Sequence, residues 1–421
     1  MAKSYRRKIN IIFILGYPIP FPCAAWRRIE YFAKFLSSNG MSIYIVGTIT
    51  HTLIRSKLKL ITCKKREHED KPLNCIILNV QPYIELKLWA VRILNMLSSL
   101  FLTSVIVLLK PKIVIVSVPK IEQVYSSYIG AKIIGAKFIV DIRDLAEDYD
   151  LSSSKGLSRK FHKLLKRLNF AIYRRANTVI TVTIVLAKYL ASYGIKAFLA
   201  PNGADTSIFK PYQNRQEVRK TLGLDDNVKI IVVNGRLGGY YRIENFLKAL
   251  AKVVNEVPHI KEKIRLLLIG GFADLNYSKT IAKMIEYLDI KELIMNVGMI
   301  KSPKRLAQIL SACDIGLVPR IDDPMFDYAI PAKFYEYIAC GLPVIVLARR
   351  GSELYNIVEQ NKLGYLCQPT DIECIIKAIK DIVFNEEKLE RLKARVLKIR
   401  KLVDRMKGAE VLYMMIKSLM R

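Results

Sequence analysis

The sequence predicts an α/β fold made of two doubly wound domains that face a central cleft. Apolar, β-branched runs recur along the chain and alternate with segments of helical periodicity. The runs are continuous, which is typical of parallel strands covered on both faces. They fall into two sets on either side of a polar, turn-rich stretch at residues 201–229. A chain of 421 residues also exceeds what one hydrophobic core usually serves.

The predicted strands are short and follow one another in chain order. They read INIIFIL, SIYIVG, NCIILNV, KIVIVSV, KFIVDI and TVITVT before the polar stretch, and KIIVVNG, RLLLIGG, IMNVGM, IGLVP and PVIVLA after it. Segments between them, such as residues 26–38 and 243–256, show the spacing of amphipathic helices.

The polar stretch predicts a domain boundary, because boundaries fall in turn-rich linkers. We expect an N-terminal, Rossmann-like domain at residues 1–207 and a C-terminal one at residues 208–399. A helix at residues 400–421 can pack back on the first domain. In doubly wound domains, ligands bind at the carboxyl ends of the strands, so we expect the site in the cleft.

The stretch PAKFYEYIACGLPVIV, residues 331–346, predicts a short helix followed by a strand. Pro331 suits the first helical turn and Gly341 the position just past a helix end. Lys333 and Glu336 then share one helix face beside an N-terminus that attracts anions. They could hold a phosphorylated, polyhydroxy ligand, or form a solvated ion pair on an ordinary helix.

The composition is that of a globular protein with a strong excess of positive charge. The chain is 52% hydrophobic and 25% charged, and 68 Lys plus Arg against 37 Asp plus Glu give a net charge of +31. Such an excess indicates a polyanionic partner. Nucleic acid, anionic lipid headgroups and nucleotide diphosphates are the candidates.

The cysteines and the N-terminus indicate the compartment. The seven cysteines are scattered, without metal-ligand spacing, which favours a reducing compartment and argues against a zinc site. The first apolar run follows a basic start but lacks a small-residue cleavage site, so we interpret it as a strand and not a signal peptide.

Residues 93–109 carry no charge and form the one transmembrane candidate in the sequence. The run is slightly shorter than the roughly 18 apolar residues of a span and contains Asn95 and several hydroxyl side chains. A buried or interfacial helix is favoured over a span.

The segment after the first strand disfavours a dinucleotide-dependent dehydrogenase. It reads GYPIPFPCAAWRR, with Ala24 and Ala25 where a phosphate-binding loop needs glycine.

Several segments in the same order resemble one family. They are DIRDLAEDY (141–149), ANTVITVT and APNGADTSIFKP, VVNGRLGGYYR, DIGLVPR, and the stretch 331–346 in the form P-x-K-x-x-E-Y. Together they resemble the GT-B-fold glycosyltransferases of the large retaining group often called family 4. The resemblance implies transfer of a hexose-like sugar, with retention, from a nucleotide-diphosphate sugar to a lipid-linked or saccharide acceptor. It also implies a role in cell-envelope polysaccharide or glycan assembly.

The resemblance assigns donor contacts residue by residue. Arg236 matches the arginine that grips the diphosphate, and Arg242 replaces the family lysine as the second catalytic cation. The alternative for both is ordinary surface charge. In many relatives a glutamate stands where this chain has Tyr328, which leaves the donor sugar open. The implied donor-binding residues are Gly235, Lys333, Glu336, Tyr328 and Asn202.

The acceptor side is predicted from strand ends in the first domain. Arg27 and Arg28 follow the first strand, and Arg143 and Asp144 end another. Asp144 is the candidate that accepts a proton or positions a hydroxyl group. Asp141 could do the same or cap the loop.

Neither a metal nor a cofactor is expected besides the nucleotide-sugar donor substrate. Retaining members of the family need no metal, and no Asp-x-Asp motif stands where a metal-dependent transferase would use it. Asp322 and Asp323 are adjacent and are interpreted as loop residues.

Residues 155–175 predict a basic amphipathic helix, and residues 55–66 form a second basic cluster. Such a helix suits an anionic membrane surface, so we expect a cytoplasmic protein, peripheral on the inner face of the cell membrane. The alternative is an apolar stripe that faces the core and a solvated back.

Two other functions compete with sugar transfer. A nucleic-acid-binding protein would interleave aromatic residues with its basic ones, and here the tyrosines are scattered, so nucleic acid is an unlikely partner. A GT-B-fold sugar-nucleotide epimerase would share the donor site and lack an acceptor.

Overall fold

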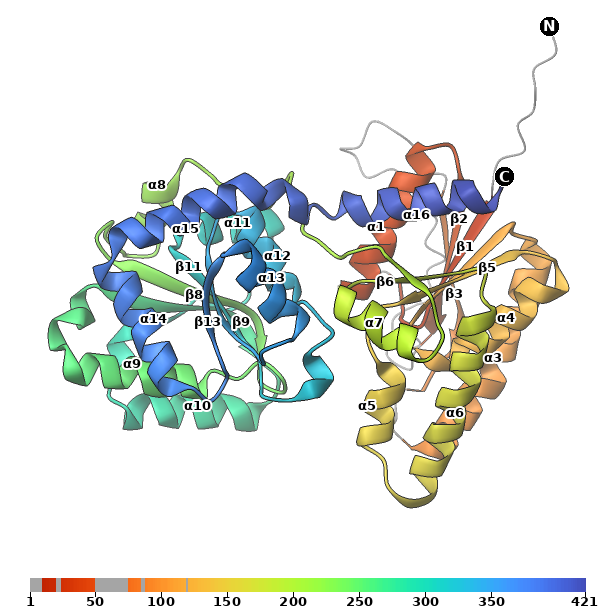
Figure 1. Cartoon of the computed structure of the whole chain (residues 1–421), viewed down its shortest axis with the longest axis horizontal. Helices are drawn as coiled ribbons and strands as arrows, with labels where there is room; N and C mark the ends of the chain where they lie inside the picture. Colours follow the sequence, from red (N-terminus) through yellow and green to blue (C-terminus); the bar gives the residue numbers. More distant parts are fainter. Residues whose placement is uncertain (1–9, 20–23, 50–74, 85–87, 119) are drawn as a thin grey trace, which may run out of the picture. The chain divides into compact units, whose positions relative to one another are not determined.

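The computed structural model describes residues 10–19, 24–49, 75–84, 88–118 and 120–421. The chain divides into two compact units: residues 1–202 with 406–421 form unit 1, and residues 203–405 form unit 2. Each unit is a parallel sheet covered by helices (Figure 1). The basic cluster predicted at residues 55–66 lies outside the described residues.

The sheet of unit 1 is parallel throughout. Its strands, in spatial order, are β3 (Cys75–Pro82), β2 (Ser42–Ile49), β1 (Asn10–Leu15), β4 (Ile113–Val118), β5 (Lys137–Ile142), β6 (Thr178–Thr181) and β7 (Ala197–Leu199). Every residue of β4 is buried, as expected of a central strand with both faces covered.

The helices of unit 1 lie on both faces of this sheet. They are α1 (Ala24–Ser38), α3 (Trp89–Leu109), α4 (Val124–Ile133), α5 (Ala146–Ser152), α6 (Gly156–Arg175), α7 (Ile184–Ser192) and α16 (Met406–Leu419). The C-terminal helix α16 packs against α1, where the rings of Phe35 and Tyr413 meet edge to face at 5.8 Å. The chain therefore returns to unit 1 after completing unit 2.

Unit 2 repeats the architecture with a sheet of six parallel strands. They are β10 (Ile294–Asn296), β9 (Ile264–Phe272), β8 (Lys229–Leu237), β11 (Ile315–Pro319), β12 (Val344–Leu347) and β13 (Gly364–Cys367). The helices are α8 (Arg215–Thr221), α9 (Glu244–Glu256), α10 (Leu275–Tyr287), α11 (Pro303–Ala312), α12 (Ala332–Ala339), α13 (Glu353–Asn361), α14 (Ile372–Phe384) and α15 (Glu386–Ile399). Alternate residues of β8 enter separate cores, Val232 on one face and Val233 on the other.

The strand order of each sheet reverses once. In unit 1 the reversal lies between β1 and β4, and in unit 2 between β8 and β11. In doubly wound sheets, ligands bind outside the carboxyl ends of the strands at this point. The residues that follow β8 and β11 are therefore the first place to look for a site in unit 2.

The structure contains each strand expected from sequence and adds β7 and β13. These two are edge strands of three and four residues, too short to give a pattern. Pro331 is the residue before α12 and not part of its first turn, while Gly341 adopts the expected left-handed conformation (φ 83°).

Two of the scattered cysteines are paired, which their spacing did not lead us to expect. Cys367 ends β13 and Cys374 lies in the first turn of α14, and the two form a disulfide. The tight turn between strand and helix brings their Cα atoms within 5.6 Å, which the spacing in the sequence does not reveal.

A buried carboxylate at the start of β11 joins four elements of unit 2. Asp314 accepts hydrogen bonds from Arg219 on α8 (2.6 Å), Arg215 on α8 (2.7 Å), Lys393 on α15 (3.3 Å) and the backbone N–H of Ile230 on β8 (2.9 Å). Burial disfavours the ionised carboxylate, but Arg215, Lys393 and Arg219 outweigh it and hold the pKa of Asp314 below its usual range.

We expect Asp314→Asn to lower the free energy of unfolding by about 3–5 kcal/mol, because buried cations lose their counter-charge. Since the folded-state pKa is depressed, this stabilisation is present above the unfolded pKa of about 3.9 and is lost as pH falls through the folded pKa. Urea denaturation at neutral and acidic pH measures both effects. The exposed ion pair of Glu387 with Arg391 supplies the control, and Glu387→Gln should cost less than about 0.5 kcal/mol. Equal losses for the two variants would contradict the assignment.

Candidate functional site

Near their carboxyl ends, β8 and β9 each have glycine at paired positions, Gly235 and Gly270. Gly235 and Gly270 have positive φ angles of 94° and 122°, a conformation that favours glycine. A Cβ atom on Gly270 would lie 2.4 Å from the carbonyl oxygen of Gly235. The close approach of the two strands therefore requires glycine at position 270, and the missing side chain at Gly235 leaves space beside Lys333.

Lys333 in the first turn of α12 carries the most unusual group of the site. Its side chain is 6% exposed, and Nζ is buried without a hydrogen-bond partner. Nζ lies 4.2 Å from the ring centroid of Tyr241 and 3.8 Å from where a Cβ on Gly235 would be. An unpartnered ammonium group thus faces the glycine edge.

The surroundings of Lys333 disfavour its charge. Burial lowers the pKa of Lys333 to about 7; Glu336 opposes this shift and Arg320 adds to it. A buried cation near a second cation is stabilised by an anion that binds between or beside them. The site therefore favours an anionic ligand.

Glu336 on the same helix is bonded to β8 and not to Lys333. Its Oε2 accepts a hydrogen bond from Nδ2 of Asn234 at 2.8 Å, and the backbone N–H of Asn234 donates to Tyr337 Oη at 2.9 Å. Oδ1 of Asn234 is buried without a partner. A solvated Lys333–Glu336 pair is thus ruled out. Carboxylate and amide oxygens instead offer acceptors for hydroxyl groups.

Arg320, directly after β11, lies in a cage of aromatic rings. It is 6% exposed and donates from Nη2 to the carbonyl oxygen of Phe326 at 2.9 Å. Its Cζ lies 4.9 Å, 5.4 Å and 5.7 Å from the ring centroids of Phe326, Tyr241 and Tyr240. Tyr241 thereby contacts both cations, Arg320 and Lys333.

Sequence reasoning missed three residues of this site: Asn234, Tyr241 and Arg320. Asn234 and Arg320 each stand at the end of a strand, next to the reversal between β8 and β11, which could have identified them. Tyr241 gave no such signal, because its place follows from the folding of the loop after β8.

Of the two arginines predicted to grip a diphosphate, Arg236 lies at the end of β8 and Arg242 on the loop that follows it. Arg236 is exposed and donates to the carbonyl oxygen of Ala273. Arg242 is 55% exposed, forms an ion pair with Glu244 at 3.1 Å and stacks on Tyr277. Neither is bonded to Lys333 or Glu336 within the described residues. Tyr328 is half-buried in the segment before α12.

In unit 1, the predicted residue Arg28 is the centre of a buried hydrogen-bond network. Its Nη2 contacts Asp141 Oδ1 at 3.0 Å and the carbonyl oxygen of Ala200 at 2.8 Å, and its Nη1 donates to Asn202 Oδ1 at 3.1 Å. Ser117 donates to the same aspartate at 3.1 Å. The network ties α1 to β5 and to the end of unit 1, which also holds Asn202.

The remaining acceptor-side candidates lie near the carboxyl end of β5 and on α1. Arg143 is 7% exposed and donates from Nε to the carbonyl oxygen of Val118 at 3.0 Å, while its Nη2 is buried without a partner. Asp144 and, on α1, Arg27 are exposed. Arg143 thus resembles Lys333 in having an unpaired buried cationic nitrogen.

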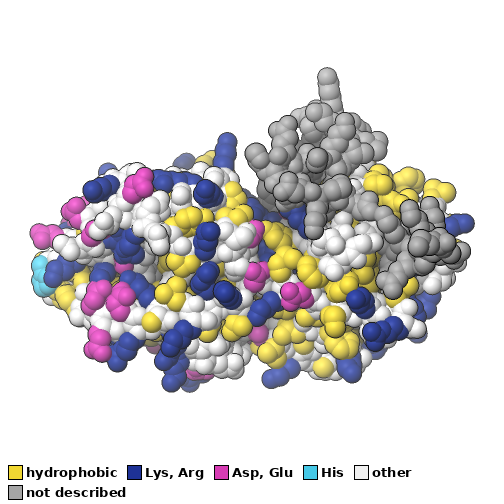
Figure 2. Space-filling view, turned by 90° about the horizontal axis from the view of Figure 1, so that it is seen from above, with side chains coloured by type: hydrophobic (Ala, Val, Ile, Leu, Met, Phe, Trp, Pro, Cys, Tyr) yellow, Lys and Arg dark blue, Asp and Glu magenta, His cyan; other side chains and the backbone are white. Residues whose placement is uncertain are grey.

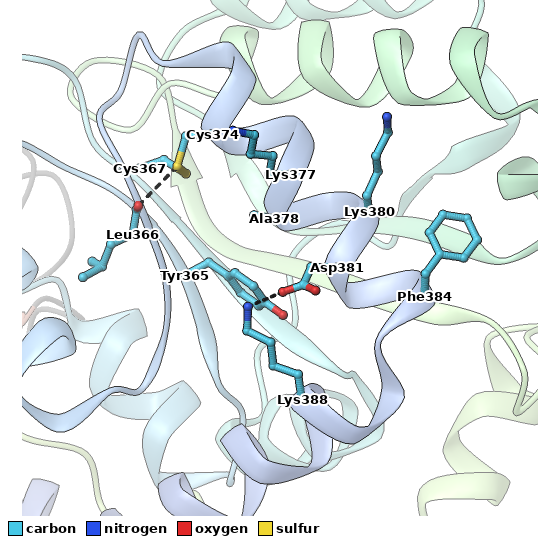
Figure 3. Close-up of a pocket in the computed structure, with 10 residues that line it drawn as sticks. All are labelled: Tyr365, Leu366, Cys367, Cys374, Lys377, Ala378, Lys380, Asp381, Phe384 and Lys388. Atoms are coloured by element: carbon cyan, nitrogen blue, oxygen red, sulfur yellow. Dashed lines mark hydrogen bonds and ion pairs between the residues drawn. A yellow bond between two sulfur atoms is a disulfide. The ribbon is translucent and has the colours of Figure 1, made fainter.

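A separate pocket of about 450 Å³ lies beside the edge strand β13, between α14 and the start of α15 (Figure 3). Tyr365, Lys377, Asp381 and Lys388 are among its lining residues. Lys388 is paired with Asp381 within the pocket. The pocket contains none of the site residues predicted from sequence, and the ion pair of Lys388 with Asp381 neutralises part of its positive charge.

The described part of the chain holds no group of three or more His, Cys, Asp or Glu arranged to bind a metal ion. The predicted Asp322 instead pairs with Arg349 at 2.7 Å, and Asp323 caps a turn by accepting from the N–H of Met325.

Comparison with known proteins finds a family model that matches part of unit 2 and curated relatives of the chain by sequence. Residues 214–398 match the family model Glycosyl transferases group 1. A D-inositol 3-phosphate glycosyltransferase of Nocardioides sp. is 24% identical over 202 residues, which cover 46% of this chain and 42% of the relative. The chain thus spans less than half the length of this curated relative.

Solved structures resemble the chain over almost its whole length. Sucrose-phosphate synthase from Thermosynechococcus elongatus superposes with a TM-score of 0.73 at 16% identity, covering 98% of this chain and 99% of the other. HepE of Anabaena, solved in complex with UDP and glucose, has a TM-score of 0.66 at 14% identity and covers 97% and 100%. These likenesses confirm the predicted fold class of two doubly wound α/β domains.

We expect Lys333→Met to stabilise the protein when no ligand is bound. Because the folded-state pKa is depressed, burial of the ammonium group costs most below about pH 7, and this cost declines as pH rises towards the unfolded pKa of about 10.4. The variant should gain about 3 kcal/mol near pH 6 and clearly less near pH 9. Chemical denaturation at both pH values measures this.

The matched control is Lys248→Met, because Lys248 is exposed on α9. It should leave the free energy of unfolding within about 0.5 kcal/mol of wild type. A loss of stability in Lys333→Met at both pH values would show that Lys333 has a stabilising partner.

Proposed function

Because residues 214–398 match the family model of the group 1 glycosyltransferases, we propose that this chain transfers a sugar from a nucleoside diphosphate to a lipid-linked or saccharide acceptor. The transfer proceeds with retention, uses a hexose-like donor and serves cell-envelope polysaccharide or glycan assembly. The observation that carries the proposal is the unpaired ammonium group of Lys333 beside Gly235.

Lys333 is suited to the diphosphate of the donor. When the bond from the sugar to the diphosphate breaks, the leaving oxygen gains negative charge, and a fixed cation in a water-poor site stabilises it. The pKa of about 7 means that the empty site is only partly charged near neutral pH. An approaching diphosphate raises this pKa, so the site takes up a proton as it binds.

Glu336 and Asn234 are suited to the nucleoside. A carboxylate accepts hydrogen bonds from both hydroxyls of a ribose, and Asn234 fixes its orientation by donating to Oε2. HepE, a neighbour in fold, was solved with UDP, which supports a nucleoside diphosphate as the ligand class.

The exposed arginines complete the donor side. Arg236 and Arg242 are bound only at the surface, so they are able to turn towards a diphosphate and act as catalytic cations. Tyr328 replaces the glutamate that contacts the sugar in many relatives, and it therefore contributes to the choice of donor sugar.

On the acceptor side, we assign Asp144 to positioning the acceptor hydroxyl and the unpaired nitrogen of Arg143 to a polar group of the acceptor. Arg27 adds positive charge, and Arg28 and Asn202 fix the backbone around them. The proposed location is the cytoplasmic face of the membrane, where the basic surface of the chain meets anionic lipid. The matched family disfavours the epimerase and nucleic-acid alternatives.

We expect the full chain to bind UDP or GDP without a sugar. Calorimetry near pH 8 in two buffers of different ionisation enthalpy should show proton uptake by wild type. Lys333→Met should abolish the uptake and weaken binding about 10- to 100-fold, the effect of losing a charged hydrogen bond. Lys248→Met should behave as wild type. Tight binding by Lys333→Met would contradict the assignment.

The role of Glu336 has its own prediction. Glu336→Gln should weaken binding of the ribonucleotide about 10-fold and leave binding of the 2′-deoxynucleotide almost unchanged. The ratio between the two nucleotides is the measured quantity. An equal loss for both would place Glu336 away from the ribose.

We also expect transfer to be independent of divalent ions and to retain the anomeric configuration. Once a donor and an acceptor are found, activity with EDTA should equal activity without it, and NMR of the product should show the donor's configuration. Loss of activity in EDTA with recovery in Mn²⁺ would place the chain in another class of transferase.

A further inference from the structure

The helix α3 of unit 1 turns its large apolar side chains outwards. Seven of them are exposed by 36–80%, and they recur every three or four residues, so they form one stripe. They are Trp89 (40%), Ile93 (36%), Leu94 (53%), Leu97 (59%), Leu100 (48%), Phe101 (53%) and Leu108 (80%).

The inner face of α3 is the more polar one. Asn95 is buried and exchanges two hydrogen bonds of 3.1 Å with the backbone of Ile84. Ser99 is buried and contacts Ser126 on α4 at 2.6 Å. Helices on soluble proteins usually place apolar residues inside and polar residues outside, whereas α3 buries two polar residues among its five buried ones and exposes most of its large apolar side chains.

The neighbouring helices extend the apolar face. α3 packs on α4, where Gly130 leaves room for Ile106, and meets α6 through Trp89 and Phe161, whose rings are 6.5 Å apart. Figure 1 shows the three helices side by side. The further exposed residues on them are Ile129 and Ile133 on α4, and Leu157, Leu164 and Leu168 on α6. We call this surface the α3–α4–α6 face.

The structure resolves the two alternatives for residues 155–175. Leu165 and Phe170 are buried in the unit, as the core-facing alternative requires. Leu157, Leu164 and Leu168 form a second stripe that stays exposed. One face of α6 therefore packs into the core of unit 1, and another face exposes apolar side chains to solvent.

The charged side chains that α3, α4 and α6 themselves carry are all basic. α3, α4 and α6 contain no Asp or Glu. On α6, Lys160, Lys163 and Arg167 are exposed beside the leucines. Arg92, the one charged residue of α3, is paired with Glu122 at 2.6 Å and Asp150 at 2.7 Å. Lys and Arg are also spread over the surface of both units (Figure 2).

We propose that the α3–α4–α6 face docks on an anionic lipid bilayer, with α3 lying in the plane of the interface. The outer stripe of α3 enters the boundary of the acyl chains, and the cations of α6 contact the headgroups. An exposed apolar surface of this extent marks an interaction site, and the exposed cations Lys160, Lys163 and Arg167 beside it favour a negatively charged partner.

α3 lies on the bilayer and does not cross it. Among the described helices it is the one whose length and composition would allow a span, with 21 residues. Its inner face, however, is held to Ile84 and Ser126 by hydrogen bonds, which a span would have to break. The docking rests on the proposed function only in giving a lipid-linked acceptor a place to meet the enzyme.

The test uses the full chain and three sets of substitutions. The α3 set is Leu94→Gln, Leu97→Gln and Phe101→Gln; the α6 set is Lys160→Gln, Lys163→Gln and Arg167→Gln. The control set changes exposed apolar residues of unit 2, Leu275→Gln, Tyr287→Gln and Met299→Gln, whose exposure is 79%, 88% and 75%. All changed residues are exposed, and thermal unfolding checks that each variant is folded.

Co-sedimentation with phosphatidylglycerol-containing and pure phosphatidylcholine vesicles gives the readout. Wild type and the control set should bind the anionic vesicles alike. The α3 set should bind at least about 10-fold more weakly to both vesicle types, because burial of each side chain contributes severalfold in affinity. The α6 set should lose the preference for anionic vesicles and the dependence on salt.

Trp89 reports the position of α3 directly. The chain has two tryptophans, so Trp26→Phe leaves Trp89 as the single fluorophore. Its emission should shift to the blue on anionic vesicles, and brominated lipids should quench it. Unchanged sedimentation of the α3 set, or a Trp89 that lipid does not quench, would overturn the proposal.

A second copy of the chain is the other possible occupant of this face. A dimer in gel filtration that the α3 set dissociates, together with wild type that ignores vesicles, would overturn lipid docking in favour of that interface. UDP binding by the α3 set, measured in parallel, separates this result from the proposed function: it should equal wild type whether or not the membrane inference holds.

Discussion

The burial of Lys333 without a partner is the constraint around which unit 2 is arranged. An ammonium group in this position costs free energy in the empty protein, and the neighbouring glycine edge and Tyr241 ring do nothing to neutralise it. Gly235 keeps the space beside it open, and Glu336 is occupied by Asn234. The burial accounts for the low pKa of Lys333, and an anion bound beside the ammonium group, such as the proposed diphosphate, offsets its cost.

Unit 1 also contains groups whose placement is unfavourable in the free protein, and they cover a larger area. On the inner face of α3, Asn95 and Ser99 form hydrogen bonds with Ile84 and Ser126. Most of the large apolar side chains of α3 are exposed on its outer face. In isolation this arrangement forgoes the free energy of apolar burial. The proposed docking on a bilayer recovers it by burying the stripe. The same reasoning applies to both units. The buried ammonium group of Lys333 is unfavourable without a ligand and suggests an anion, and the exposed apolar stripe of α3 is unfavourable in water and suggests an apolar partner.

Two kinds of charged group in the chain differ in their role: buried ion pairs that stabilise each unit, and cations on the surface. Asp314 with Arg215 and Arg219 holds unit 2 together, and Arg28 with Asp141 does so in unit 1. These pairs are satisfied internally, so they have little to offer a ligand. The net charge of +31 comes instead from surface Lys and Arg, which have few acidic neighbours and are available to phosphates of a donor or of lipid.

The sequence by itself determined all the strands except β7 and β13, the two doubly wound domains and the placing of Lys333 and Glu336 on one helix face. These follow from local periodicity, because side chains three or four residues apart on a helix must point the same way. Only the tertiary structure decided that Lys333 is buried, that Arg320 and Asn234 join it from other strands, and that α3 exposes its apolar stripe. Periodicity reports which residues share a face. Which face is covered depends on packing between segments far apart in the chain, such as α3 with α4, and no local pattern contains that information.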